Sequence, residues 1–207
     1  MKKHYLIILC LFLSFLCGCS GTPRFHVNPQ WKEAPSSFTV LFSEPYVQNQ
    51  DDVADDLPEY VANFSSWFGQ ELAIEFEKQS GIKPAVLLQK DEHFSIVPLP
   101  LDSSVASRVP IPIVDSLPNV KGIVICIHPI QVWRRDDRCM GGTSCLPDHY
   151  LLFSSTYTIV SMEEQRVLAY GVLGVNSSFK FAMTKGDWED DMSALVEQIL
   201  EKTPLKK

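Results

Sequence analysis

The chain has 207 residues and a formal net charge of −7, with 45% hydrophobic, 11% aromatic and 21% charged residues. This composition is typical of a globular protein with a buried core and excludes a disordered tail. The acidic balance argues against a nucleic-acid partner, because phosphate binding requires a basic face and the basic residues are scattered. The length fits a single domain.

The first twenty residues have the layout of an export signal. Lys2 and Lys3 precede the apolar run YLIILCLFLSFLCG. Ser20 and Pro23 arrive too early for a membrane-crossing helix, which needs roughly 20 apolar residues. We therefore expect residues 1–18 to be a signal peptide that is removed.

The end of the apolar run, Leu16-Cys17-Gly18-Cys19, resembles the lipobox of bacterial lipoproteins. That pattern has a leucine three residues before the modified cysteine and a small residue directly before it. Cys19 fits the pattern, whereas Cys17 does not, because Ser14 and Leu16 stand at its corresponding positions. The resemblance implies cleavage before Cys19, a thioether-linked diacylglycerol on Cys19 and acylation of its amino group, as by palmitate. An ordinary secretory signal and an uncleaved amphiphilic anchor are the alternatives.

The resemblance also implies a location in the cell envelope. Similar lipoproteins of two-membrane bacteria use Asp after the cysteine to stay in the inner membrane, and here the residue is Ser20. We therefore expect attachment to the outer membrane, facing the periplasm. Residues 19–37 carry three prolines without clean periodicity and are expected to form an extended tether, followed by one periplasmic domain over residues 38–207.

The domain is expected to begin with a strand over residues 38–47, FTVLFSEPYV, and a helix. The helix is indicated by an apolar stripe with spacings of three and four residues, made of Leu57, Val61, Phe64, Phe68, Leu72 and Phe76. Asp56 and Glu59 resemble a capping box, and Gly81 is expected to end the helix.

Residues 83–89 predict a second strand, and two proline-rich segments follow at 97–104 and 109–118. Alternating prolines lack the amides of a central ladder, so these segments are expected at edges or as connections, with a partner-binding groove or loop as the alternative. The apolar run at 121–133 predicts a strand in the middle of the sheet.

A hairpin is predicted from residues 150–160 and 167–175, followed by a helix over 188–202. In that helix Asp187 is the expected cap, and the apolar stripe consists of Trp188, Met192, Leu195 and Ile199. The sum is an α+β fold with two main helices packed on an antiparallel or mixed sheet. The order of elements is similar to that of small periplasmic domains in outer-membrane lipoproteins that activate penicillin-binding proteins or serve secretion and transport machines, which implies an accessory role.

Three cysteines remain after Cys19. Cys139 and Cys145 bracket a short glycine-containing loop and are expected to form a disulfide in an oxidising periplasm. Cys126 lies in the apolar strand and is expected to be a buried free thiol. The alternative is a metal site from both loop cysteines and His149, with Asp136 or Asp148 as a fourth ligand, but this spacing does not match the close cysteine pairs of zinc sites.

The sequence contains no recognisable catalytic motif, so we assign no catalytic residue, metal or cofactor. His128 precedes Pro129 inside the apolar strand and is expected to be a core or edge residue rather than a base.

Arg134, Arg135 and Arg138 lead into the cysteine loop and form the candidate interaction surface, with internal ion pairing as the alternative. We expect a non-enzymatic accessory or binding module for a periplasmic or outer-membrane protein assembly. A small-molecule or lipid-binding module and an anchored hydrolase without a visible motif are the alternatives.

Replacing Cys19 by Ala tests the anchor. Cys19→Ala should remove the acyl chains and leave the signal uncleaved, because the sulfur is the attachment point and lipidation precedes cleavage in proteins with this motif. Metabolic labelling with palmitate and electrophoretic mobility measure both effects. Cys17→Ala is the matched control and should be processed normally; unchanged processing and membrane retention of Cys19→Ala would refute the lipoprotein interpretation.

Overall fold

The computed structural model describes residues 24–48, 53, 63–101, 106–137, 148–179 and 183–207. Its strands are β1 (Phe25–Val27), β2 (Phe38–Ser43), β3 (Tyr46–Val47), β4 (Ala85–Gln89), β5 (Phe94–Pro100), β6 (Ala106–Pro112), β7 (Ile123–Ile127), β8 (Gln131–Asp137), β9 (Asp148–Ser161) and β10 (Arg166–Phe179). The helices are α3 (Phe64–Ser80) and α4 (Lys185–Leu200), with short 3-10 turns at Asp91–His93 and Val114–Ser116.

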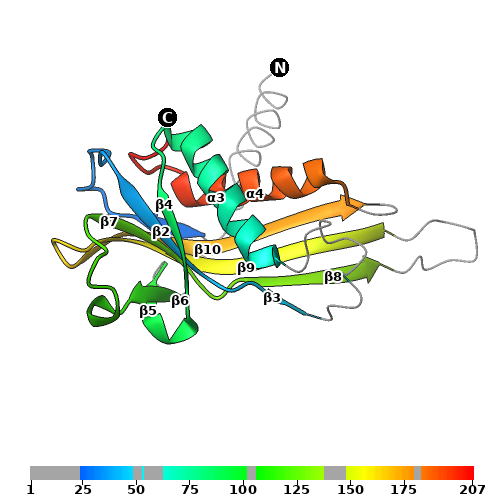
Figure 1. Ribbon diagram of the computed structural model, residues 1–207, viewed down its shortest axis with the longest axis horizontal. Coiled ribbons are helices and arrows are strands. Elements are labelled where there is room, and N and C mark those ends of the chain that lie inside the picture. The colour runs from blue at the N-terminus through cyan, green and yellow to red at the C-terminus, as the bar shows by residue number, and fades with distance from the viewer. Residues whose placement is uncertain (1–23, 49–52, 54–62, 102–105, 138–147, 180–182) are drawn as a thin grey trace, which may run out of the picture.

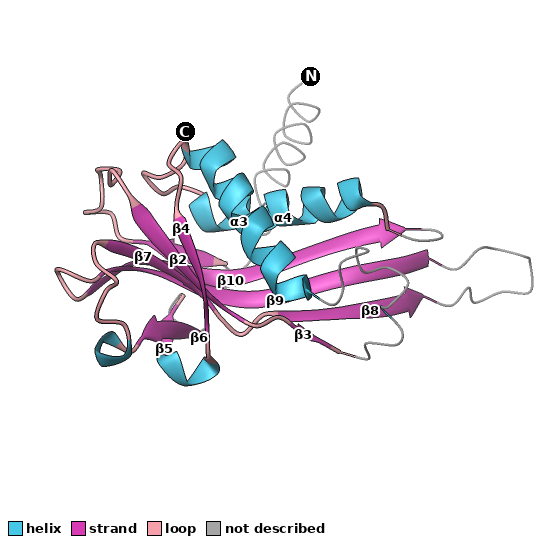
Figure 2. Ribbon diagram, viewed as in Figure 1, coloured by secondary structure: helices cyan, strands magenta, loops and turns pink. Residues whose placement is uncertain are grey.

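The predicted α+β class is confirmed. In the described residues, an eight-stranded mixed sheet runs in the order β1-β10-β9-β7-β2-β4, with β8 beside β9 and β3 beside β8. Helices α3 and α4 cover one face of this sheet, and the two-stranded β5–β6 hairpin lies on the other (Figures 1 and 2). The predicted hairpin is also confirmed, because β9 and β10 pair antiparallel along their length.

Strand β9 pairs with two shorter strands, one after the other, along the same edge. Its second half pairs with β7 and its first half with β8. Between them Pro129 interrupts the run that the sequence predicts as one strand, because proline has no amide to donate. Thr156 bridges the interruption, since its carbonyl accepts from the His128 amide at 3.1 Å and its hydroxyl donates to the His128 carbonyl at 2.8 Å.

The first predicted strand is interrupted at the same level. Glu44-Pro45 separates β2 from β3. β2 runs parallel between β7 and β4, whereas β3 pairs with β8. The chain therefore leaves β4 after Ser43 and continues beside a different strand.

The main core lies between the helices and the sheet. Aromatic side chains fill it where α3 meets α4: the ring of Trp188 stands edge-on to those of Phe64, Trp67 and Phe153, at centroid distances of 5.8, 5.7 and 5.5 Å. Gly69 lets α3 approach β2 closely, because a Cβ atom there would lie 2.9 Å from the Phe42 ring. Aromatic pairs of this geometry add about 0.5–1.5 kcal/mol each beyond their buried area.

The helix ends confirm one prediction and correct another. Gly81 ends α3 in the left-handed conformation, with φ of 73°, and its amide donates to the Glu77 carbonyl. In α4 the cap is Thr184 and not Asp187, and Asp187 instead completes a capping box from the third helical position. The predicted start of the first helix, at residues 56–61, lies outside the described residues.

The proline-rich segments form the β5–β6 hairpin, outside the main sheet. Pro98, Pro100, Pro110 and Pro112 all occupy alternate pairs of its ladder, so the missing amides fall on pairs that exchange no hydrogen bonds. The hairpin is held to the sheet by the hydroxyls of Thr158 and Tyr170, which donate to the carbonyls of Pro110 and Pro100. A second small core lies beneath it, formed by Leu41, Phe94, Leu117, Val124 and Cys126.

Cys126 is a buried free thiol, as the sequence indicates. Burial raises its pKa well above the ordinary value, so it stays protonated and unreactive.

Part of the predicted tether packs on the domain. β1 adds antiparallel to β10 at one end of the sheet, and the Trp31 side chain is buried in the main core. Among the described residues, no helix has the length and apolar composition needed to cross a membrane.

A carboxyl group is buried where α4 meets the sheet. The Ser177 hydroxyl on β10 donates to Oδ1 of Asp191, which is only 3% exposed. Burial raises the pKa of Asp191 from 3.8 to about 6, and the bond from Ser177 offsets part of that effect.

Asp191 should make stability depend on pH in the direction opposite to an ordinary salt-bridged carboxylate. Between pH 3.8 and about 6 the folded chain retains a proton that the unfolded chain has released. The stability that protonated Asp191 contributes is therefore complete below pH 3.8 and is lost as pH rises through about 6. The free energy of unfolding of Asp191→Asn minus that of the parent should therefore be larger near neutral pH than in acid, by about 1–3 kcal/mol. Urea unfolding across this range measures the difference; parallel profiles for parent and variant would contradict it.

Candidate functional site

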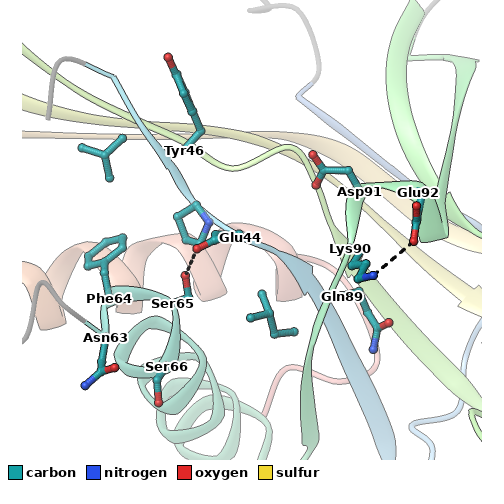
Figure 3. A pocket seen from close by; sticks show the side chains of 13 residues that line it. Glu44, Tyr46, Asn63, Phe64, Ser65, Ser66, Gln89, Lys90, Asp91 and Glu92 are labelled. Atoms are coloured by element: carbon teal, nitrogen blue, oxygen red, sulfur yellow. Dashed lines mark hydrogen bonds and ion pairs between the residues drawn. The ribbon is translucent and has the colours of Figure 1, made fainter.

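An open groove lies at the carboxyl end of the parallel strands. β2 and β4 pair as far as Ser43 and Gln89, and then the two chains diverge. One turns at Pro45 into β3, and the other continues into the 3-10 turn at Asp91–His93. The first turn of α3 closes the remaining side, as Figure 3 shows. The proline break in β2 thus opens a groove of about 1240 Å³.

The groove combines exposed apolar side chains with carboxylates. Tyr46 is 65% exposed and Leu88 is 50% exposed, and Phe64 lies beside them with its ring largely buried. Single exposed apolar residues are ordinary, whereas these two line one concave surface, which makes it the candidate contact site. The other lining residues are Glu44, Pro45, Val47, Asn63, Ser65, Ser66, Gln89, Lys90, Asp91 and Glu92.

The charged groups of the groove interact only weakly with one another. Ser65 donates to Glu44 at 3.3 Å, and Lys90 lies 3.7 Å from the Glu92 carboxylate. Both members of the latter pair are more than two-thirds exposed, so their attraction contributes little. With three carboxylates against one ammonium, the groove favours a ligand that brings positive charge or hydrogen-bond donors.

His128 lies behind the groove, at the carboxyl end of β7. Its side chain is 11% exposed and stacks on the Phe94 ring at 4.8 Å. Nδ1 is 3.5 Å from Asp91 Oδ1, close enough for electrostatic contact but not aligned as a hydrogen bond. Burial lowers the pKa of His128, and the Asp91 charge opposes that effect only in part, so the ring is neutral at pH 7.

Two of the predicted interaction residues, Arg134 and Arg135, lie on opposite faces of the sheet, because neighbouring side chains on β8 alternate between its faces. Arg134 is 18% exposed, donates from Nε to Asp136 at 2.8 Å and lies over the Phe179 ring. Its neighbour Arg135 lies over the Tyr150 ring at 4.8 Å and is exposed. The internal ion pairing left open by the sequence therefore occurs for Arg134.

Asp136, the partner of Arg134, also contacts His149, the histidine of the alternative metal site. His149 Nδ1 lies 2.7 Å from the Asp136 carboxylate, and this bond together with Arg134 lowers the pKa of Asp136. Within the described ranges, no group of three or more His, Cys, Asp or Glu side chains could hold a metal ion. Cys19, Arg138, Cys139 and Cys145 lie outside the described residues, so the lipidation and disulfide predictions stay predictions.

Sequence reasoning missed the groove because its residues come from segments far apart in the chain. The available signal was Glu44-Pro45 inside an otherwise continuous strand pattern, since a proline at that place ends a central strand. The divergence of β2 from β4 is a tertiary event that spacing cannot reveal.

No protein-family model matches the chain. No curated protein matches it either.

Solved structures resemble the chain remotely. A variant of the PelC dodecamer from Paraburkholderia phytofirmans has 9% identity and a TM-score of 0.40 over 89% of this chain and 98% of that chain. A homolog of a neuraminyllactose-binding hemagglutinin from Helicobacter pylori has 13% identity and a TM-score of 0.41 over 86% and 89%. A minor lipoprotein from Acinetobacter baumannii has 12% identity and a TM-score of 0.34 over 78% and 88%. At these identities and scores, function has to be argued from the chain's own residues.

The exposed groove residues should contribute little to stability. Tyr46→Ser should change the free energy of unfolding by less than about 0.5 kcal/mol, because the ring packs against little in the folded chain. Phe64→Ala, at a buried position of the same groove, should cost about 3–5 kcal/mol. Chemical denaturation of both variants measures these effects, and a large loss from Tyr46→Ser would mean that its ring supports the fold.

Proposed function

We propose that this protein is a membrane-anchored envelope lipoprotein whose α+β domain is a non-enzymatic binding module for a periplasmic or outer-membrane protein assembly. Residues 1–18 are the signal peptide, Cys19 carries the lipid and the outer membrane is the site of attachment. The domain of residues 38–207 faces the periplasm, and its groove between β3, β4 and α3 receives an extended segment of the partner.

The anchor rests on the sequence. Leu16-Cys17-Gly18-Cys19 follows a basic head and an apolar run, which is the context a lipobox requires. One acyl chain binds a membrane marginally, at about 0.8 kcal/mol per buried methylene, whereas two or more hold a protein firmly. Anchoring also raises the effective concentration of the domain near a partner in the same membrane, so a weak interface suffices.

The open groove carries the proposal. Tyr46 and Leu88 expose apolar surface to solvent at a concave site, and that surface gains free energy when a partner covers it. Glu44, Asp91 and Glu92 surround these side chains with negative charge. We therefore expect the partner segment to alternate apolar side chains with Lys or Arg.

The shape of the groove favours a protein segment over a small molecule. Small-molecule sites enclose most of the surface of their ligand and are lined mainly by apolar side chains. Most of the lining residues of this groove are polar. An extended polypeptide uses such a surface well, because its backbone adds hydrogen bonds and alternate side chains enter the groove.

The 134–145 region is a second candidate contact. Arg135 is exposed on the sheet face opposite Arg134, so it is the described residue of this region that is best placed to meet a partner. The predicted Cys139–Cys145 disulfide would hold the adjoining loop in one shape.

Crosslinking in intact cells, followed by purification of the full lipidated protein, tests the proposal. The parent should bring down a reproducible envelope protein. Tyr46→Ser combined with Glu44→Lys should reduce its recovery about tenfold or more, because the first change removes an apolar anchor and the second reverses a charge.

The matched control is Ile74→Ser on α3, which removes an exposed apolar side chain outside the groove and should recover the partner in full. Charge reversal at Arg134 and Arg135 separates the second candidate contact from the groove. Equal recovery with every variant would refute the groove as the contact site, and recovery of the protein alone would refute the binding-module proposal.

A further inference from the structure

Strand β4 forms one edge of the main sheet. It pairs in parallel with β2, and within the described ranges it has no second partner (Figure 1). An outer strand presents a row of amide and carbonyl groups along its free edge, which can pair with a strand from another chain.

The side chains of β4 leave apolar surface on both faces of this edge. Leu88 lies opposite Phe42 and shares the helix face of the sheet, whereas Leu87 lies opposite Leu41 on the hairpin face. Leu88 is 50% exposed and Leu87 is 40% exposed. A strand added beside β4 would cover both leucines, whereas binding to one face would cover only one.

We propose that β4 pairs antiparallel with β4 of a second copy of this chain, with Leu87 on the two-fold axis. This places Leu87 beside the partner's Leu87 on one face, and Val86 beside the partner's Leu88 on the other. Two-fold contacts of this kind are self-complementary, so the same strand supplies both halves of the interface.

The charges at the ends of β4 fit this arrangement. With Leu87 on the axis, Lys83 lies opposite the partner's Asp91, and the pair occurs twice by symmetry. Lys90 has extended backbone angles, with φ of −75° and ψ of 151°, so the chain stays extended as far as Asp91. A parallel pairing in the same register would instead place Lys83 beside the partner's Lys83. Opposite charges across a strand pair are favourable and like charges are unfavourable.

The dimer is suited to a membrane-anchored chain. Its strand has only five residues, so pairing in dilute solution is weak. Two chains anchored in one membrane meet at a high effective concentration, which favours pairing there. The dimer goes beyond the proposed binding function. Its paired segment includes Leu88 to Asp91, which also line the groove, whereas Tyr46 and Glu44 lie outside this contact.

Cysteine crosslinking of the full lipidated chain in membranes tests the register. Leu87→Cys should form an intermolecular disulfide under mild oxidation, because directly opposed residues of antiparallel strands have Cα atoms about 4.5–5.5 Å apart, within the range a disulfide spans. Ile74→Cys, at a position that is 54% exposed on α3, is the matched control and should give no dimer. Cys126 does not compete, because it is buried.

A charge pair at the axis tests the same contact without oxidation. Leu87→Lys and Leu87→Glu should each weaken dimerisation about tenfold or more at a high protein concentration in detergent at which the parent is dimeric, because each places like charges together. An equimolar mixture of the two variants should recover the dimer. Light scattering measures the mass, and circular dichroism verifies that each variant is folded.

Several outcomes would overturn the proposal. These are equal crosslinking from Leu87→Cys and Ile74→Cys, crosslinking of Leu87→Cys to a different envelope protein only, or a mixture that stays monomeric while both variants are folded. Because Tyr46→Ser should leave the dimer intact, loss of partner capture by the groove and loss of self-pairing by β4 are separate results.

Discussion

The architecture depends on β9, the strand that stays continuous where its neighbours break. Pro45 and Pro129 interrupt two parallel chains at the same level of the sheet, and neither position can donate a ladder hydrogen bond. β9 crosses that level without interruption, and Thr156 uses its carbonyl and its hydroxyl to hydrogen-bond the backbone amide and carbonyl of His128. The fold thus keeps one sheet on both sides of a break that would otherwise end it.

The two faces of the sheet are covered differently. On one face, α3 and α4 lie over the sheet and bury an aromatic cluster centred on Trp188. On the other, the β5–β6 hairpin covers only the region around Leu41 and Cys126. A hairpin rich in proline suits that place, because it can lie on a sheet through side-chain contacts and two hydroxyl bonds without joining its ladder.

Both surfaces that we assign to binding follow from this geometry. The groove exists because the chain that leaves β2 departs from β4 at Pro45, and the free edge exists because β4 is the outermost strand on its side among the described residues. The two surfaces share Leu88 to Asp91, whereas Glu44, Tyr46 and the first turn of α3 belong to the groove alone. On a membrane, two anchored copies with two grooves would bind a repetitive partner more firmly than one.

Sequence patterns located most of the elements because their signals are local. Helix signals depend on residues three or four apart, as in the apolar stripe of Phe68, Leu72 and Phe76. The capping pattern of α4 is equally local, although it predicted Asp187 as the cap and the structure has Thr184. The lipobox is likewise a local pattern, and it rests on the sequence alone.

The groove and the free edge were decided by tertiary structure. Glu44, Phe64 and Asp91 meet only after β2, α3 and β4 are packed, and no spacing in the chain encodes that meeting. The same holds for Arg134 and Arg135, whose separation onto opposite faces depends on the pairing of β8 with β9. The sequence by itself determined the class of fold and the place of most elements, because these depend on short-range chemistry, and the proposed location in the envelope rests on the sequence alone. Only long-range strand pairing decided which side chains share a surface.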